Sequence, residues 1–206
     1  MTYAQIEASV ISWLNRLNFP SLEAEVELFI EMAQRRVWRT ADLNAMRTSI
    51  QFTTDVPTIP ADYMRTHAMV IPLSTRNVEV NGAPLKKVLQ AGLNGVPTKY
   101  TAVNTEFLFG PTPDQNYTVN LLYYAALPNV STSVTNNWLS DNAPEIIIFG
   151  AVMEACLWLK DDNRAGVYEG RFMASLKELT DSEEEMAREG GSLQVSGEFN
   201  TDYDNV

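Results

Sequence analysis

The hydrophobic period of the chain changes twice along its 206 residues, and this change limits the folds open to it. Near the start, Ile6, Val10 and Leu14 recur at helical spacing, after a capping box formed by Thr2 and Gln5. Helical spacing returns after about residue 143, whereas the middle of the chain alternates like strands. Strands placed between two runs of helices predict an α+β fold with segregated layers rather than a wound parallel sheet.

Two helices are expected on each side of the strands. After the first, a second should begin with Ser21 as its cap and continue to about residue 39, with a further turn or two over 40–47. The segment 143–160 is apolar on nearly every side, which predicts a central helix that begins at Pro144. A fourth helix is predicted by the spacing of four apolar residues: Val167, Phe172, Leu176 and Leu179.

The middle of the chain reads as short strands over 49–54, 67–73, 76–80, 99–103, 106–110 and 117–125. Asn81-Gly82 and Asn104-Thr105 have the composition of tight turns. The stretch "FLFGPTPDQNYTVNLLYYAALP" (107–128) reads as an aromatic hairpin closed by a loop rich in proline and asparagine. These strands are expected to form an antiparallel subdomain.

The predicted domain plan has three parts. The two terminal helix pairs, residues 1–47 and 143–189, should pack together as a four-helix bundle, and residues 48–142 should form an inserted β-rich subdomain. Residues 190–206 are rich in glycine, serine, asparagine and aspartate, a composition that cannot bury a core and predicts a flexible C-terminal arm.

The charge and cysteine content exclude several classes of protein. A net charge of −11 and a pI near 4.5 argue against a free-standing nucleic-acid binder, which needs a basic face. Cys156 is the only cysteine, so a disulfide within the chain is impossible, and its apolar setting predicts a buried thiol. We expect no secretory signal, because the start "MTYAQIEASV" has no basic region followed by an apolar core. We also expect no membrane span, because no apolar run approaches about 18–20 residues.

The sequence offers little reactive chemistry. His67 is the only histidine, which excludes zinc sites of the usual spacing, and no phosphate-binding glycine loop is present. The paired carboxylates at 161–162 and the glutamate run at 183–185 are interpreted as a solvated turn and a solvated helix face. No catalytic residue, no metal ligand and no cofactor is predicted.

One basic cluster stands out, formed by Arg35, Arg36 and Arg39 with Trp38 between them. Such arginines can bind nucleic acid, or they can serve as helix-dipole and salt-bridge partners. From Glu154 to the C-terminus there are 13 acidic and 5 basic residues, a net charge of −8. A basic patch and an acidic half on one chain favour head-to-tail contact between identical subunits, so this cluster is the candidate subunit or partner interface.

Several segments occur in an order that resembles a known family: "IPADYMR" (59–65), "GVPTKYTA" (95–102), the stretch 107–128, and "TNNWLSDNAPEIIIFGAVMEACLWLKDDNRAGVYEGRF" (135–172). The chain is similar to the head-to-tail adaptor (connector) proteins of tailed bacteriophages, including the tail tubular protein A type. The resemblance implies a helical bundle with a β-rich subdomain and a ring, typically a dodecamer, seated beneath the portal protein. It implies no shared catalytic residues.

The resemblance also implies partners. The β subdomain would face the tail or nozzle protein, and the arm would dock along the portal. Candidate docking residues in the arm are Ser192, Leu193, Val195, Phe199 and Tyr203. DNA would pass through the ring without specific binding, since acidic walls repel phosphate. The chain would be made in the host cytoplasm and end in the virion.

Two other readings stay open: a virion-associated peptidoglycan hydrolase, and a small intracellular binding module. We expect the isolated chain to be a monomer, because an arm that becomes ordered only on binding keeps free subunits apart.

Overall fold

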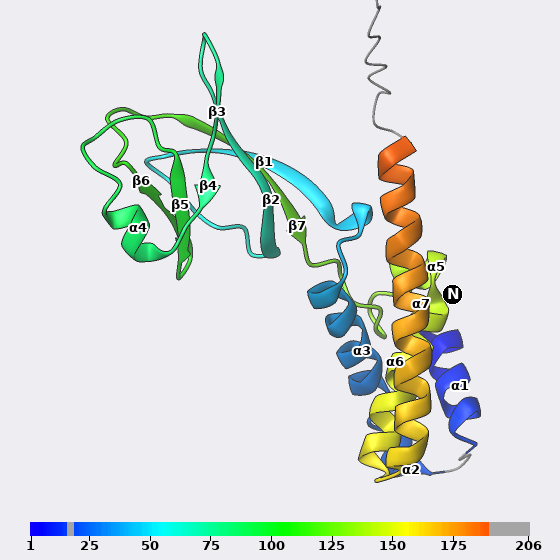
Figure 1. The fold of residues 1–206 in the computed structure, drawn as a ribbon. Helices are drawn as coiled ribbons and strands as arrows, with labels where there is room; N and C mark the ends of the chain where they lie inside the picture. Colours follow the sequence, from blue (N-terminus) through cyan, green and yellow to red (C-terminus); the bar gives the residue numbers. More distant parts are fainter. Residues whose placement is uncertain (16–18, 190–206) are drawn as a thin grey trace, which may run out of the picture.

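The computed structural model describes residues 1–15 and 19–189, so the predicted arm and its five candidate docking residues lie outside the described part. The chain combines helices with two sheets, as the α+β prediction requires (Figure 1). The helices are α1 (Tyr3–Leu14), α2 (Pro20–Glu23), α3 (Val26–Thr40), the 3-10 turn η1 (Asn44–Met46), α4 (Leu85–Leu89), α5 (Trp138–Asn142), α6 (Pro144–Trp158) and α7 (Asp162–Glu189). The strands are β1 (Arg47–Thr53), β2 (Tyr63–Pro72), β3 (Asn77–Glu79), β4 (Asn81–Gly82), β5 (Lys99–Val103), β6 (Glu106–Gly110) and β7 (Thr118–Ala125).

The strands form two sheets that extend to one side of the helices (Figure 1). The larger sheet has the order β1-β7-β2-β3 with every pair antiparallel, and β7 lies at its centre. The smaller sheet has the order β4-β5-β6. Its β4–β5 pair is parallel, so the prediction of a purely antiparallel subdomain was wrong at this pair.

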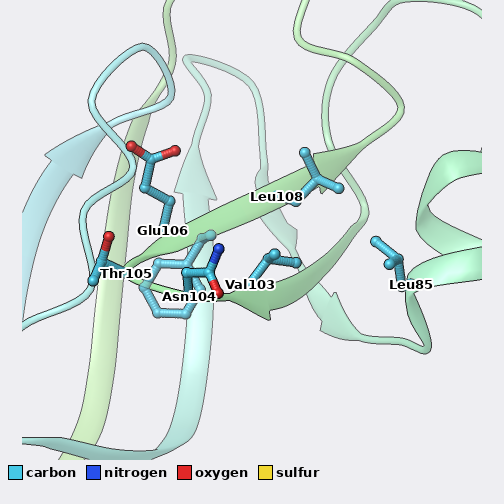
Figure 2. A pocket seen from close by; sticks show the side chains of 7 residues that line it. Leu85, Val103, Asn104, Thr105, Glu106 and Leu108 are labelled. Carbon is cyan, nitrogen blue, oxygen red and sulfur yellow. The ribbon is translucent and has the colours of Figure 1, made fainter.

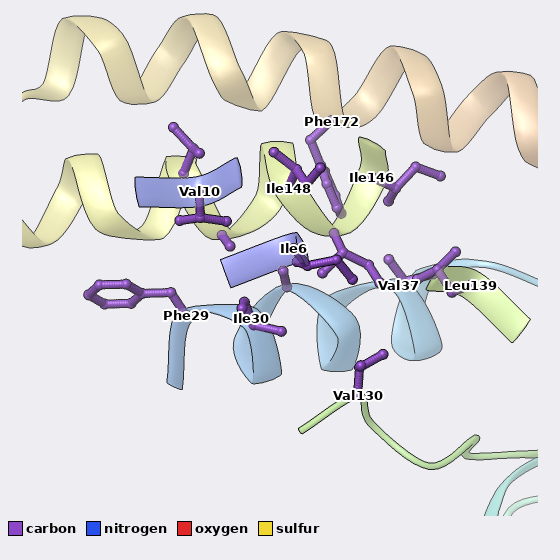
Figure 3. Close-up of a cluster of buried hydrophobic side chains, with 14 of the residues drawn as sticks. Ile6, Val10, Phe29, Ile30, Val37, Val130, Leu139, Ile146, Ile148 and Phe172 are labelled. Atoms are coloured by element: carbon purple, nitrogen blue, oxygen red, sulfur yellow. The ribbon is translucent and has the colours of Figure 1, made fainter. Parts of the chain in front are cut away.

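The helices share one aliphatic core around α6, which contacts α1, α3, α5 and α7. Residues from α1, α3, α5, α6 and α7 meet there, together with Val130 from the segment that follows β7 (Figure 3). The prediction that the apolar segment 143–160 is central is confirmed, because α6 buries residues on all its faces. Gly150 is required at this point, since a Cβ there would lie 2.7 Å from the Ala33 Cβ and 3.2 Å from the Phe172 ring.

A second, aromatic core lies between the two sheets. The Phe52 ring stacks on Phe107 with centroids 5.7 Å apart, and Tyr63 and Tyr100 meet Phe107 edge-on. Every strand except the short β4 contributes to this core, directly or at its edge. The chain therefore has two clusters of buried residues, one helical and one in the strands.

The interpretation of 107–128 as one hairpin was wrong. β6 pairs with β5, whereas β7 pairs with β1 and β2, so the proline-containing loop carries the chain from one sheet to the other. The Asn81-Gly82 turn was wrong as well, because these residues form β4 beside Lys99 and Tyr100. By contrast, the Asn104-Thr105 turn between β5 and β6 is confirmed, with Asn104 at a φ of 55°.

Helix boundaries differ from the prediction at three places. Phe19, not Ser21, occupies the N-cap of α2, and Pro20 follows as the first helical residue. Residues 40–47 form only the 3-10 turn η1 before β1 begins at Arg47. α7 begins at Asp162, and Val167 is turned outward rather than into the core. The domain bounds remain a prediction. Val130 and Leu139, which these bounds assign to the β-rich subdomain, pack into the helical core.

Candidate functional site

The predicted basic cluster lies in the last turns of α3, where its members take different roles. The Arg36 guanidinium donates to Glu154 Oε1 at 2.7 Å, and the Glu154 side chain is only 8% exposed. The positive charge of Arg36 is therefore directed into the protein, where it neutralises a carboxylate on α6. This arginine holds α3 to α6.

Arg35 and Arg39 point outward. The Arg35 side chain is 65% exposed and pairs with Glu31 one turn earlier at 2.6 Å. Arg39 is exposed, and its Nε donates to the Arg35 carbonyl oxygen at 3.1 Å. Surface pairs of this kind add little to stability, so these two guanidinium groups are available to a partner.

Trp38 belongs to the helical core, with 2% of its surface exposed. Its Nε1–H donates to Asn129 Oδ1 at 2.9 Å, which fixes the segment that follows β7. The outward part of the predicted interface is therefore formed by Arg35 and Arg39. Trp38 instead lines an open pocket of about 510 Å³ where α3 meets the strands. The other residues that line this pocket are Arg35, Arg39, Met64, Ala126, Leu127 and Asn129.

A junction that sequence reasoning missed joins the helices to the large sheet. Arg65 on β2 donates to the Ala41 carbonyl oxygen at 2.6 Å and forms an ion pair with Asp42. Its guanidinium also lies over the Tyr124 ring, 4.7 Å from the centroid. No local sequence signal predicts this contact, because its partners come from α3's end, β2 and β7.

A second pocket, of about 420 Å³, lies between α4 and the small sheet, away from the helical core. Figure 2 shows Leu85, at the start of α4, near Val103 on β5 and Leu108 on β6. All three side chains are partly open to solvent, while Phe107 closes the pocket from the core side. The pocket is also lined by Asn104, Thr105 and Glu106, and an exposed hollow that mixes apolar and polar side chains suits a protein partner.

The polar residues weighed as catalytic candidates serve structural roles. Asp161 accepts from the Arg164 backbone N–H at 3.3 Å, at the start of α7. Glu183 was expected on a solvated face, but it is buried and its Oε2 accepts from the Asn44 N–H at 2.7 Å. His67 lies edge-on to Tyr124. Burial raises the pKa of the Cys156 thiol, as befits a packing residue rather than a nucleophile.

Within 1–15 and 19–189, no group of three histidine, cysteine or carboxylate side chains is arranged to bind a metal. In the same part of the chain, no helix has the length and apolar character needed to cross a membrane.

The model of a family described as SU10 adaptor protein matches residues 1–195, which include both cores. No curated protein matches the chain.

Proposed function

The chain belongs to the SU10 adaptor protein family, a family of phage head-to-tail adaptors, and is thus a structural virion protein; on this premise we propose that it docks beneath the portal ring, forms a ring itself, connects the head to the tail and provides a passage for DNA. The observation that carries the proposal is the extent of the match, over residues 1–195. It covers the helices and the strands together, and therefore the whole described architecture.

The C-terminal arm is proposed to bind the portal. Four of its candidate docking residues are apolar or aromatic and are separated by polar residues and one glycine, which suits a segment anchored in a groove by a few side chains: Leu193, Val195, Phe199 and Tyr203. Ser192, Leu193 and Val195 fall within the family match, whereas Phe199 and Tyr203 lie beyond it. The arm would become ordered on docking, and the cost of that ordering would keep the free chain monomeric.

The small sheet is proposed to face the tail or nozzle protein. The support is the exposed hollow beside Leu85, Val103 and Leu108, which lies at the far end of the strands from the helices (Figures 1 and 2). The helical core would then support the contacts within the ring, and the strand core would support the contact with the tail.

The net charge of −11 supports passage rather than binding of DNA. A wall of carboxylates repels phosphate and offers no cation to displace the counterions of the duplex. The ring is proposed to be a dodecamer, following the family resemblance.

Native mass measurement of purified portal rings with and without the chain tests this function. The full chain should add a whole number of copies to each portal ring, the same number in every preparation. A chain shortened to residues 1–189 retains the whole described fold and serves as the control, and it should bind far more weakly.

No mass gain with the full chain would contradict the adaptor function, and equal binding of the shortened chain would contradict the role of the arm. A peptidoglycan zymogram checks the enzymatic alternative, for which a cleared band is the outcome that would favour a hydrolase.

A further inference from the structure

The outward face of α3 is divided into an apolar half and a basic half. The helix packs on the core through Val26, Ile30, Ala33 and Val37, which lie on one side. The opposite side carries four residues at spacings of three and four, which are Leu28, Met32, Arg35 and Arg39. Leu28 is 47% exposed and Met32 39%, although both are large apolar side chains near the start of the helix.

The outward face of α7 is divided in the same way, with the opposite charge. Its inward side buries Phe172 and Leu176 against α6. The outward side begins with small and apolar residues and continues with acidic ones, in the order Gly166, Val167, Gly170, Met173, Ala174, Glu178, Asp181 and Glu185. Val167 is 58% exposed and Met173 54%. Lys177 also lies on this side, while Arg171 is turned toward the rings of Trp13, Phe149 and Tyr168.

The two helices run in the same direction. Trp158, just before α7, contacts Phe19 and Phe29 near the start of α3, so both helices begin at the same end of the molecule (Figure 1). Leu28 to Arg39 spans 39 − 28 = 11 positions and Gly170 to Asp181 spans 181 − 170 = 11 positions, which is about 16 Å of helix in each case. The distance from the apolar half to the charged half is thus the same on both helices.

Two glycines on α7 have no explanation within the chain. A Cβ at Gly166 or Gly170 would meet no atom within 4 Å, in contrast to Gly150, where Ala33 and Phe172 leave no room. Glycine destabilises a helix interior relative to alanine, so two of them on one exposed face need a reason. Close approach of a helix from another molecule supplies that reason.

We infer that the outward face of α7 in one copy packs against the outward face of α3 in a second copy. Leu28 and Met32 then lie against Gly170 and Ala174, and Arg35 and Arg39 face Glu178 and Asp181 across the contact. The two helices of one copy offer different faces, so the contact is heterologous and can continue from copy to copy around a closed ring. This inference deepens the proposed ring by naming the surfaces that form it.

Chemical cross-linking with singly substituted chains tests the contact. Cys156 is fully buried, so Met32→Cys and Ala174→Cys each present one accessible thiol. The two variants should be treated with a short bis-maleimide separately and as a mixture, both on portal rings and alone at high concentration. The mixture should yield covalent dimers and each variant alone should not. A mixture of Met32→Cys with Arg76→Cys, whose thiol lies in the exposed turn between β2 and β3, is the matched control.

Charge exchange gives a second readout. Arg39→Glu or Asp181→Arg alone should lower the number of copies loaded on the portal by about tenfold or more, because like charges then face each other. The double variant should regain most of the loading, and Arg76→Glu should load like the unmodified chain.

The outcomes separate this inference from the proposed function. The unmodified chain could load on the portal while no mixed dimers form and the double variant restores nothing. That outcome overturns the α3–α7 contact alone. Mixed dimers at high concentration without loading on the portal support the contact and overturn the portal-docking function. If the portal is not loaded and no mixed dimers form, both the α3–α7 contact and the portal-docking function are overturned.

Discussion

The helical region and the strand region are stabilised by cores of different composition. The helices bury a continuous aliphatic core around α6, and most of its members come from residues three or four positions apart. The strands bury a smaller aromatic core, in which rings from distant segments meet around Phe107. The comparison teaches that local spacing specifies the first region, whereas only the tertiary fold brings the second together.

The surfaces of the two regions differ as well. On the helices, exposed apolar residues continue into charged residues, which are basic on the outward face of α3 and mostly acidic on that of α7. In the strand region, three exposed apolar residues line a hollow: Leu85, Val103 and Leu108. Complementary faces suit contact between copies, and a hollow suits an unlike partner.

Removal of one aromatic ring from each core should have the largest effect. Phe172→Ala and Phe107→Ala should each cost about 3–5 kcal/mol, because both rings are fully buried. Amide hydrogen exchange should show lost protection in α6 and α7 for Phe172→Ala, and in β5 to β7 for Phe107→Ala. Loss of protection throughout the chain in both variants would show one cooperative unit and contradict the predicted domain division.

A buried amide holds the segment that follows β7 against α3 and gives the next largest effect. Gln34 is fully buried, its Oε1 accepts from the Val130 N–H at 2.8 Å, and its Nε2 donates to the Val130 carbonyl oxygen at 3.3 Å. Gln34→Leu should lower the free energy of unfolding by about 2–4 kcal/mol, because Val130 loses both partners. Chemical denaturation measures this loss. A change below the error of the measurement would mean that water replaces the amide.

The phenol of Tyr3 should make the helical region sensitive to alkaline pH. Burial, followed by the charges of Glu7 and Glu27, raises the pKa of Tyr3 from 10.0 to about 12. The neutral phenol is therefore favoured in the folded state, and its contribution to stability is complete below pH 10 and is lost as the pH rises toward 12. The free energy of unfolding should fall by about 2 kcal/mol across this range.

The matched variant Tyr3→Phe removes the titrating group and should flatten that fall. Burial and the hydrogen bond to Asp62 also raise the pKa of Tyr123 in the strand core, so some alkaline dependence should remain. An unchanged pH profile in Tyr3→Phe would contradict the role of Tyr3.

Two glycine substitutions should give the smallest effects, with opposite signs. Gly150→Ala forces Ala33 or Phe172 to move, and this strain should exceed the gain in helix propensity by about 1 kcal/mol. Gly170→Ala meets no neighbour and should raise the stability of the isolated chain by up to about 1 kcal/mol. Thermal unfolding distinguishes the two. Equal shifts of the same sign would contradict the packing around Gly150.

The parts of the fold that follow from sequence are those set by local chemistry. The capping box of Thr2 and Gln5, the all-round apolar α6 and the turn at Asn104 were predicted and are present. The pairing of β6 and β7 with different strands could not be predicted, because strand partners depend on contacts distant in sequence. No local signal of this kind predicts that Glu183 is buried, because its partner Asn44 lies 139 positions away in the sequence.

The candidate interface was predicted in composition but not in orientation. The arginine spacing in α3 puts Arg35 and Arg39 one turn apart, and the structure shows both exposed on the side of α3 that also carries Leu28 and Met32. It could not show that Arg36 turns inward to Glu154, because that carboxylate comes from another helix. It also could not show that Trp38 is covered by the segment after β7.

Cryo-electron microscopy of the full chain bound to its portal tests the central claim most directly. We predict a closed ring beneath the portal in which α3 of each copy lies parallel to α7 of the next, with the small sheet turned away from the portal. Portal particles without added density, or copies bound singly with no helix contact between them, would contradict it.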